Sequence, residues 1–162
     1  MRAASKSAGN AVRNALNLLR NPIVSAYLSV FAFEFDAGEE EELNADDILF
    51  SQASVNNTEE IVASMQARGW IGPGVDVVKL EDGTLVTLDN SRVFAAGQAG
   101  IQVQAVVHDA ADTISPERGQ AFLEQYGTRP SSWGEAAELR IGSQNAGFRD
   151  TYPNGSPYTG VK

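Results

Sequence analysis

The feature that most constrains the fold is a β-hairpin signal in the middle of the chain. Two runs rich in β-branched residues, Asp76–Leu80 and Thr84–Leu88, flank the tripeptide Glu81-Asp82-Gly83. An Asp-Gly step lets the chain reverse within two or three residues, because glycine readily adopts the positive φ that such turns need. The sequence therefore predicts two neighbouring antiparallel strands, around which the other elements must be arranged.

Short elements of alternating type surround this hairpin. The pattern predicts strands at Ile48–Phe50 and Val103–Val107, a helix from Glu59 to Gly69 capped by Asn57 or Thr58, a turn at Trp70–Gly74, a helix from Ser91 to about Gly100 capped by Asn90, helices at Pro116–Tyr126 and Trp133–Ile141, and an irregular tail from Gly147. The expected fold class is α/β (α+β), with a small mixed sheet, a hairpin and flanking helices.

The first 47 residues differ from the rest in charge and periodicity. Residues 1–22 carry four basic side chains and no acid, and 34–47 carry eight acids and no base. Ser5–Arg20 has the spacing of an amphipathic helix, and the apolar run Pro22–Phe35 is shorter than the ~20 residues that span a bilayer. We expect an N-terminal helical and apolar segment without a stable membrane span, which contacts a carrier protein or chaperone; a signal peptide is the alternative. The acidic stretch Ala37–Asp47 is predicted to be a solvated linker, with the folded domain at 48–162.

The composition narrows the chemistry. There is no cysteine and one histidine among 162 residues, which excludes thiolate nucleophiles and multi-histidine metal cages. No resident cofactor is predicted, and a metal would have to be a hard cation such as Mg²⁺, held by carboxylates and substrate oxygens. From residue 48 onward eight Lys/Arg oppose thirteen Asp/Glu. Any contact with nucleic acid must therefore be local, because nonspecific affinity comes from neutralising phosphates.

Several short motifs, taken in order, resemble a known superfamily. They are Phe50-Ser51-Gln52, the hairpin that starts at Asp76-Val77-Val78, the junction Leu88-Asp89-Asn90-Ser91-Arg92-Val93, and a tail with Ser132-Trp133-Gly134-Glu135, Arg140-Ile141, Gln144, Phe148-Arg149 and Tyr152–Ser156. Together they resemble the ParB/sulfiredoxin-like fold, and most of all toxin domains of that superfamily at the C-termini of bacterial polymorphic toxins such as Rhs and contact-dependent inhibition proteins. The resemblance implies a secreted effector that acts in the cytoplasm of a target bacterium and is neutralised by a cognate immunity protein.

The junction between the second hairpin strand and the next helix is a candidate phosphate site. A strand that ends at a helix start presents free backbone N–H groups and the positive end of the helix dipole. Arg92 in the first turn could hold phosphate oxygens with two N–H groups, and Asn90 could orient the scissile group. Asp89 and Arg92 therefore join the candidate catalytic residues. The alternative is that Asp89 or Asn90 only caps the helix and Arg92 pairs with a surface acid.

His108 completes the candidate catalytic set. It ends a predicted strand and precedes Asp109, and an imidazole beside a carboxylate can act as general acid or base near neutral pH. A surface histidine without catalytic function is the alternative. Gln52 follows a short strand, where its amide could bind phosphate or a base edge, or satisfy the loop backbone.

The last third of the chain mixes guanidinium groups with aromatic rings, as single-stranded nucleic acid would require. Its candidate binding residues are Arg140, Gln144 and Arg149, with Trp133, Phe148 and Tyr152 as stacking or core residues. The favoured function is a nuclease that cleaves phosphodiester bonds. The alternatives are a nucleotide-binding or phosphotransfer domain and a non-enzymatic interaction module.

Overall fold

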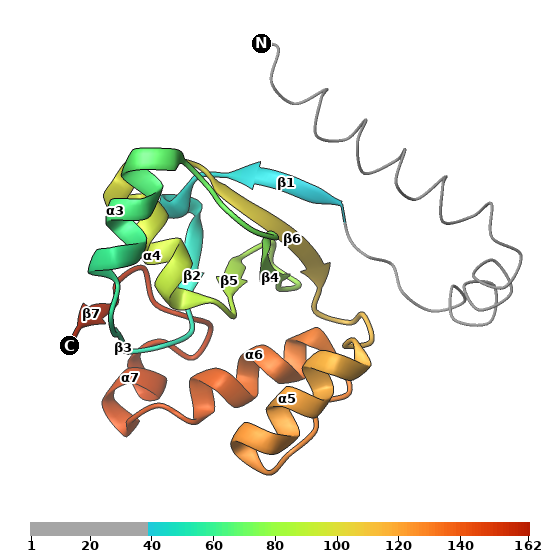
Figure 1. Cartoon of the computed structure of the whole chain (residues 1–162). Coiled ribbons are helices and arrows are strands. Elements are labelled where there is room, and N and C mark those ends of the chain that lie inside the picture. Colours follow the sequence, from blue (N-terminus) through green and yellow to red (C-terminus); the bar gives the residue numbers. More distant parts are fainter. Residues whose placement is uncertain (1–38) are drawn as a thin grey trace, which may run out of the picture. The chain divides into compact units, whose positions relative to one another are not determined.

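A computed structural model describes residues 39–162, which form a mixed α/β domain (Figure 1). Its elements are β1 (Glu40–Leu43), the 3-10 turn η1 (Ala45–Asp47), β2 (Ile48–Phe50), β3 (Ser54–Val55), α3 (Glu59–Arg68), β4 (Val75–Lys79), β5 (Leu85–Thr87), α4 (Asn90–Ala99), β6 (Val103–Asp109), α5 (Pro116–Tyr126), α6 (Trp133–Gly142), α7 (Ala146–Thr151) and β7 (Gly160–Val161). The predicted helix Ser5–Arg20 and apolar run Pro22–Phe35 lie outside the described residues. Within 39–162, none of the helices has the length and apolar character needed to cross a membrane.

Five of the strands form one mixed sheet in the order β1-β6-β4-β5-β2. β4 and β5 pair antiparallel, which confirms the hairpin, while β6 runs parallel to β4 and β2 parallel to β5. The expected mixed sheet with flanking helices is therefore confirmed. β3 and β7 form a separate two-stranded parallel pair.

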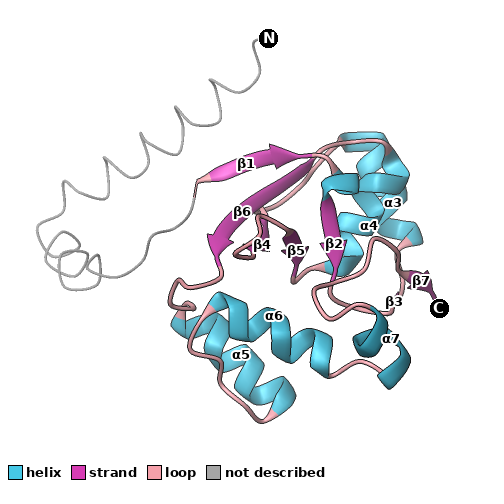
Figure 2. Ribbon diagram, turned by 180° about the vertical axis from the view of Figure 1, so that it is seen from behind, coloured by secondary structure: helices cyan, strands magenta, loops and turns pink. Residues whose placement is uncertain are grey.

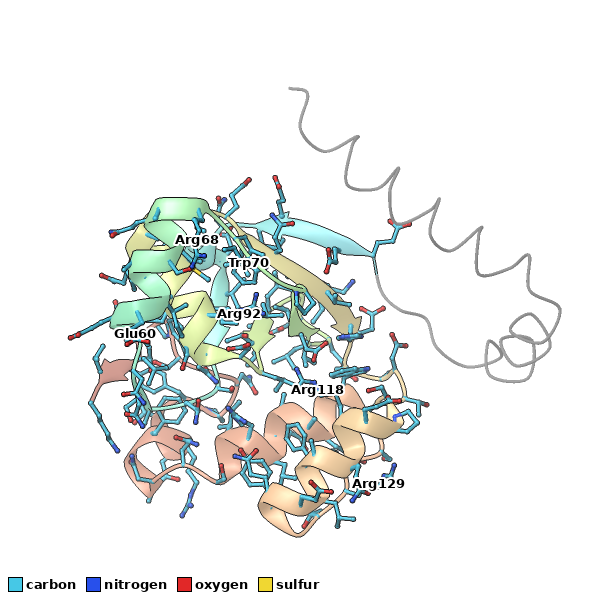
Figure 3. The ribbon with its side chains drawn as sticks, in the orientation of Figure 1. Glu60, Arg68, Trp70, Arg92, Arg118 and Arg129 are labelled. Carbon is cyan, nitrogen blue, oxygen red and sulfur yellow. The ribbon has the colours of Figure 1, made fainter. Side chains whose placement is uncertain are left out.

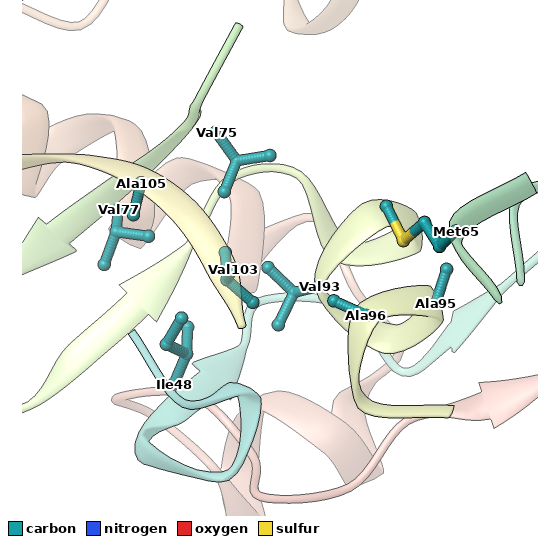
Figure 4. Packing of buried hydrophobic residues seen from close by; sticks show 9 residues of the cluster. All are labelled: Ile48, Met65, Val75, Val77, Val93, Ala95, Ala96, Val103 and Ala105. Carbon is teal, nitrogen blue, oxygen red and sulfur yellow. The ribbon is translucent and has the colours of Figure 1, made fainter. Parts of the chain in front are cut away.

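Helices cover both faces of the sheet, because side chains alternate between faces along each strand. Figures 1 and 2 show α3 and α4 on one side and α5 and α6 on the other. On the α3/α4 face, Val75 and Val77 pack with Val103 and with Val93 of α4 (Figure 4). On the other face, a second cluster holds Val78, Leu88, Ile114, Phe122, Trp133, Ala136 and Ala137. The sheet is thus the middle layer of a three-layer domain.

The prediction of a solvated linker before residue 48 is wrong for residues 40–47, which form β1 and η1. Glu40–Leu43 is strand β1, which pairs antiparallel with β6 from Glu40↔Val106 to Leu43↔Val103. Leu43 packs against the α3/α4 core, while Glu42 accepts a hydrogen bond from Gln104 at 3.0 Å. An acidic stretch can form this strand because it lies at the edge of the sheet, where its carboxylates stay in water.

The tail from Gly147 is also more ordered than predicted. Asn145 caps α7 by accepting a hydrogen bond from the backbone N–H of Phe148 at 3.0 Å, and Phe148 is buried. The chain then returns to β2, where Phe50 and Ser156 exchange backbone hydrogen bonds of 2.7 and 2.8 Å. The C-terminal residues therefore hold the end of β2 in place.

Candidate functional site

Asp76 takes part in two of the three ion pairs found among the described residues. Its Oδ1 lies 2.9 Å from Nε2 of His108, and its Oδ2 lies 2.5 Å from both Nε and Nη2 of Arg118. The side chains of His108 and Asp76 are 9% and 17% exposed, whereas that of Arg118 is 44% exposed. The His108–Asp76–Arg118 group therefore links a buried imidazole to a guanidinium at the surface.

The sheet register brings these residues together. His108 pairs with Val78 and Asp76 with Val106 across the parallel strands β4 and β6, so the two side chains lie diagonally on the α5/α6 face. Figure 3 shows Arg118 between α5 and the sheet. β6 is longer than predicted and includes His108, which confirms that this residue lies near the end of its strand.

Trp133, the first residue of α6, fixes the plane of the imidazole. The two rings are stacked with centroids 3.6 Å apart and an angle of 9° between their planes. α6 comes this close because Gly134 has no side chain: its N–H donates to the Ala110 carbonyl at 2.8 Å, and a Cβ there would lie 2.9 Å from the same oxygen.

Electrostatics determine which ring nitrogen of His108 carries the hydrogen. Burial raises the pKa of Asp76, but the hydrogen bond with His108 and the charge of Arg118 together lower that pKa below its usual value. Asp76 is therefore ionised at neutral pH and can only accept hydrogen bonds, so Nε2 of His108 carries a hydrogen and donates to it. In the uncharged form of the ring Nδ1 carries the lone pair, and within the described residues it has no hydrogen-bond partner. This arrangement suits a general base.

The β5–α4 junction has a structural role that involves Asn90. β2 and β5 are parallel, with Phe50 opposite Thr87, so their C-terminal ends meet at one edge of the sheet. Asn90 is 1% exposed, and its Oδ1 accepts from the backbone N–H of Ser51 at 2.8 Å while its Nδ2 donates to the Ser51 hydroxyl at 3.0 Å. That hydroxyl donates to the Thr87 carbonyl at 2.6 Å. The amide of Asn90 is thus engaged in joining two strand ends.

Asp89 and Arg92 are also engaged at this junction. Asp89, rather than Asn90, is the N-cap of α4, and its carboxylate accepts from the backbone N–H of Arg92 at 3.3 Å. The guanidinium of Arg92 donates to the carbonyls of Ile71 and Pro73 at 2.9 Å each and lies 4.2 Å from the ring centroid of Trp70 (Figure 3). It therefore secures the turn between α3 and β4, which differs from the expected pairing with phosphate or a surface acid.

Three of the predicted binding residues, Gln52, Arg140 and Gln144, lie together between α6 and the loop after β2. Arg140 donates to Oε1 of Gln52 and to the Tyr126 hydroxyl, both at 3.2 Å. Gln144 accepts from the backbone N–H of Ala53 at 3.1 Å and donates to the Arg140 carbonyl at 3.3 Å, which ties the loop after β2 to α6.

Arg149 and Asp109 lie apart from these groups. The exposed Arg149 donates to the carbonyls of Gly142 and Gln144, and so closes the turn between α6 and α7. Asp109 is exposed and forms an ion pair with Lys79 at 2.9 Å, so the carboxylate that orients His108 is not its sequence neighbour. In residues 39–162, no cluster of three or more His, Asp or Glu side chains is arranged to hold a metal ion.

Sequence reasoning missed Asp76 and Arg118. Asp76 gave a detectable signal, because it is a lone charge between Val75 and Val77 in a strand of a predicted hairpin. A charge in a strand that is buried on both faces needs a partner. Arg118 gave no such signal, since an arginine in the first turn of a helix is ordinarily solvated.

Comparison with known proteins does not assign the chain to a family: no protein-family model and no curated protein matches this chain.

Proposed function

We propose that the folded domain is an antibacterial effector nuclease. It cleaves phosphodiester bonds in the cytoplasm of a target bacterium and is neutralised by a cognate immunity protein. The observation that supports this function most is the His108–Asp76–Arg118 group, in which a single carboxylate orients an imidazole and holds a half-exposed guanidinium.

In this proposal His108 transfers the proton. Nδ1 accepts a proton from the attacking oxygen, either a ribose 2′-hydroxyl or a water, as that oxygen forms its bond to phosphorus. The ester bond to the leaving oxygen breaks, and the imidazolium returns the proton to that oxygen. Asp76 keeps Nε2 protonated throughout and stabilises the positive ring, and the indole of Trp133 adds to this stabilisation because it stacks on the cation.

Arg118 is the proposed ligand of the reacting phosphate. Nε and Nη2 contact Asp76, and Nη1 makes no hydrogen bond within the described residues, so it can donate to a phosphate oxygen. This role replaces the one expected of Arg92, whose donors are engaged with carbonyls. The N-terminus of α4 is a weaker phosphate site than the sequence indicates, because the carboxylate of Asp89 already caps it.

The test is inducible expression of the full chain in a bacterial cytoplasm, followed by growth and by the integrity of total DNA and RNA. The variants are His108→Gln, which keeps an amide donor for Asp76, and Arg118→Gln. Arg129→Gln is the matched control, because Arg129 is exposed, follows α5 in the sequence, and donates its one side-chain hydrogen bond among the described residues to the Pro116 carbonyl.

Wild type and Arg129→Gln are expected to stop growth and degrade one class of nucleic acid. His108→Gln should lose about 100-fold or more of the cleavage rate, as is usual when a general base is removed. Folded protein is verified by thermal unfolding of each variant. If growth stops while DNA and RNA stay intact, or if folded His108→Gln cleaves as fast as wild type, the proposed chemistry is wrong.

A further inference from the structure

Arg140 differs from the other arginines of the described residues in the surroundings of its guanidinium. Arg118 pairs with a carboxylate, Arg92, Arg129 and Arg149 donate to backbone carbonyls, and the exposed Arg68 donates to the Ser64 hydroxyl. Arg140 is half-buried, takes part in none of the ion pairs of residues 39–162, and meets only the neutral oxygens of Gln52 and Tyr126. Its Nε is the single buried side-chain N or O atom without a hydrogen-bond partner in this part of the chain.

The buried, unpaired Nε of Arg140 lowers the stability of the fold. A buried donor without an acceptor costs about 1 to 3 kcal/mol, and more when it is charged. Buried charges in proteins are ordinarily paired with an opposite charge. The guanidinium of Arg140 therefore lacks a negative group.

The neighbours of Arg140 present donors, which identifies the kind of group that is lacking. Gln52 accepts from Arg140 through Oε1, so its amide group is left with two N–H donors, and neither has a partner among the described residues. Tyr126 accepts through its hydroxyl oxygen, so its O–H is likewise left to donate. A guanidinium, an amide and a hydroxyl with unused hydrogens match an anion that has several acceptor oxygens.

We propose that Gln52, Tyr126 and Arg140 form a phosphate subsite, here named the Arg140 subsite. Gln144 is its positioning residue, because it bonds both to Ala53 beside Gln52 and to the Arg140 carbonyl. Its assignment to a phosphate of the substrate strand, next to the one that is cleaved, rests on the proposed function. That the subsite binds a tetrahedral phosphate is inferred only from the free hydrogen-bond donors of Gln52, Tyr126 and Arg140, and does not depend on the proposed function.

The subsite is tested by binding without cleavage. The full chain is titrated with inorganic phosphate and, in a second series, with dimethyl phosphate, a diester without a base, while NMR follows the side-chain N–H signals of Gln52 and Arg140. Saturable shifts of these signals are expected with both probes. A shift with inorganic phosphate alone overturns the assignment to a substrate strand, and the absence of a saturable shift with either probe overturns the subsite.

Variants distinguish specific phosphate binding at this subsite from a general effect of the protein's net charge. Arg140→Gln should bind about 10-fold or more weakly, since a charge-assisted hydrogen bond contributes about 1.5 to 3 kcal/mol. Tyr126→Phe, which removes only a hydroxyl, should bind a few-fold more weakly. Arg129→Gln loses the same charge and should bind as wild type does. Equal losses in Arg129→Gln and Arg140→Gln, or unchanged binding by folded Tyr126→Phe, contradict the proposal.

A possible folding defect of Arg140→Gln is controlled by Arg140→Lys, which keeps the charge without the planar fork and should show intermediate affinity. Failure of the subsite and failure of the proposed function give different results. Nucleic-acid cleavage without shifts at Gln52 and Arg140 overturns the subsite and leaves the nuclease. Shifts without cleavage leave a phosphate subsite in a domain that is not a nuclease.

Discussion

Asp76 shows how one side chain can connect the interior of the domain with its surface. Its carboxylate would be costly to bury alone, since a carboxylate loses its hydration in the interior. His108 and Arg118 each satisfy one of its oxygens, and Arg118 extends to solvent. The arrangement keeps the carboxylate charged, which in turn holds the imidazole in a single tautomer.

Asp76 also predicts how stability depends on pH. Because its pKa in the folded protein is lowered, the unfolded chain binds more protons than the folded one below the ordinary aspartate pKa of about 3.9. The stability from Asp76 is thus complete above that pH and is lost as the pH falls through the folded pKa. Asp76→Asn should lower the free energy of unfolding by about 2 kcal/mol at neutral pH, as expected for charge-assisted hydrogen bonds.

Urea unfolding of wild type and Asp76→Asn from pH 2.5 to 6 measures this contribution. The difference between the two free energies should be largest above about pH 4 and should shrink at lower pH. The other carboxylates are common to both proteins, so their contributions largely cancel in the difference. A difference that does not change with pH would show that the carboxylate charge of Asp76 does not stabilise the fold.

At the scale of elements, the start of α6 decides the geometry of the site. Trp133 stacks on His108, and the following residue, Gly134, lies against the loop after β6. The N-cap Ser132 accepts from the backbone N–H of Glu135 at 3.2 Å, which places the start of the helix at this point. The close approach of α6 to the loop therefore controls how tightly the two rings stack.

Two glycines of α6 allow a matched test of this contact. In Gly134→Ala, the new Cβ would lie 2.9 Å from the Ala110 carbonyl oxygen, a backbone atom that cannot rotate away. The substitution should cost about 2 kcal/mol of stability, within the range for overpacking, and should lower nuclease activity because His108 is displaced. Gly142→Ala meets no atom within 4 Å and should be neutral or up to about 1 kcal/mol stabilising, owing to its higher helix propensity.

Chemical denaturation of both variants gives the two stability changes, and near-ultraviolet circular dichroism follows the stacked indole of Trp133. Equal effects of Gly134→Ala and Gly142→Ala would mean that α6 can shift without cost. In that case the short contact at Ala110 would not hold the imidazole in place.

At the scale of the whole molecule, β1 completes the sheet. It covers one edge of β6, the strand that carries His108, and brings Leu43 onto the α3/α4 core. Glu40 accepts from the backbone N–H of Gly74 at 2.8 Å, which secures the loop just before β4. Residues 40–43 therefore support both strands of the His108–Asp76–Arg118 group, although they lie in the stretch predicted as a linker.

Truncation tests this contribution. A fragment of residues 39–162, which contains every described element, is the reference. Residues 48–162 should be about 2 to 3 kcal/mol less stable, from the lost burial of Leu43 and the lost hydrogen bonds to β6. Thermal unfolding of both fragments provides the measurement. Equal stability of the two would show that β1 adds nothing to the sheet.

The local elements of this domain could be predicted from the sequence. Asp-Gly between two β-branched runs defines the hairpin, and Ser115-Pro116 and Ser132 before apolar spacing mark the starts of α5 and α6. These signals are readable because turn geometry and capping depend on residues that are neighbours in the chain. His108 as a candidate for proton transfer follows from its being the only histidine at a strand end.

The tertiary structure alone decides the partners of these residues. Asp76 lies 32 residues from His108 and 42 from Arg118, and Gln52 lies 88 from Arg140. The register of β4 with β6 and the docking of α5 and α6 bring them together. Only the tertiary structure shows that the side chains of Asn90 and Arg92 form hydrogen bonds within the domain, Asn90 with Ser51 and Arg92 with backbone carbonyls. The same polar side chain at a strand–helix junction can form hydrogen bonds with the backbone or with a ligand. Which of the two it does depends on which chain segments lie within about 3 Å of it.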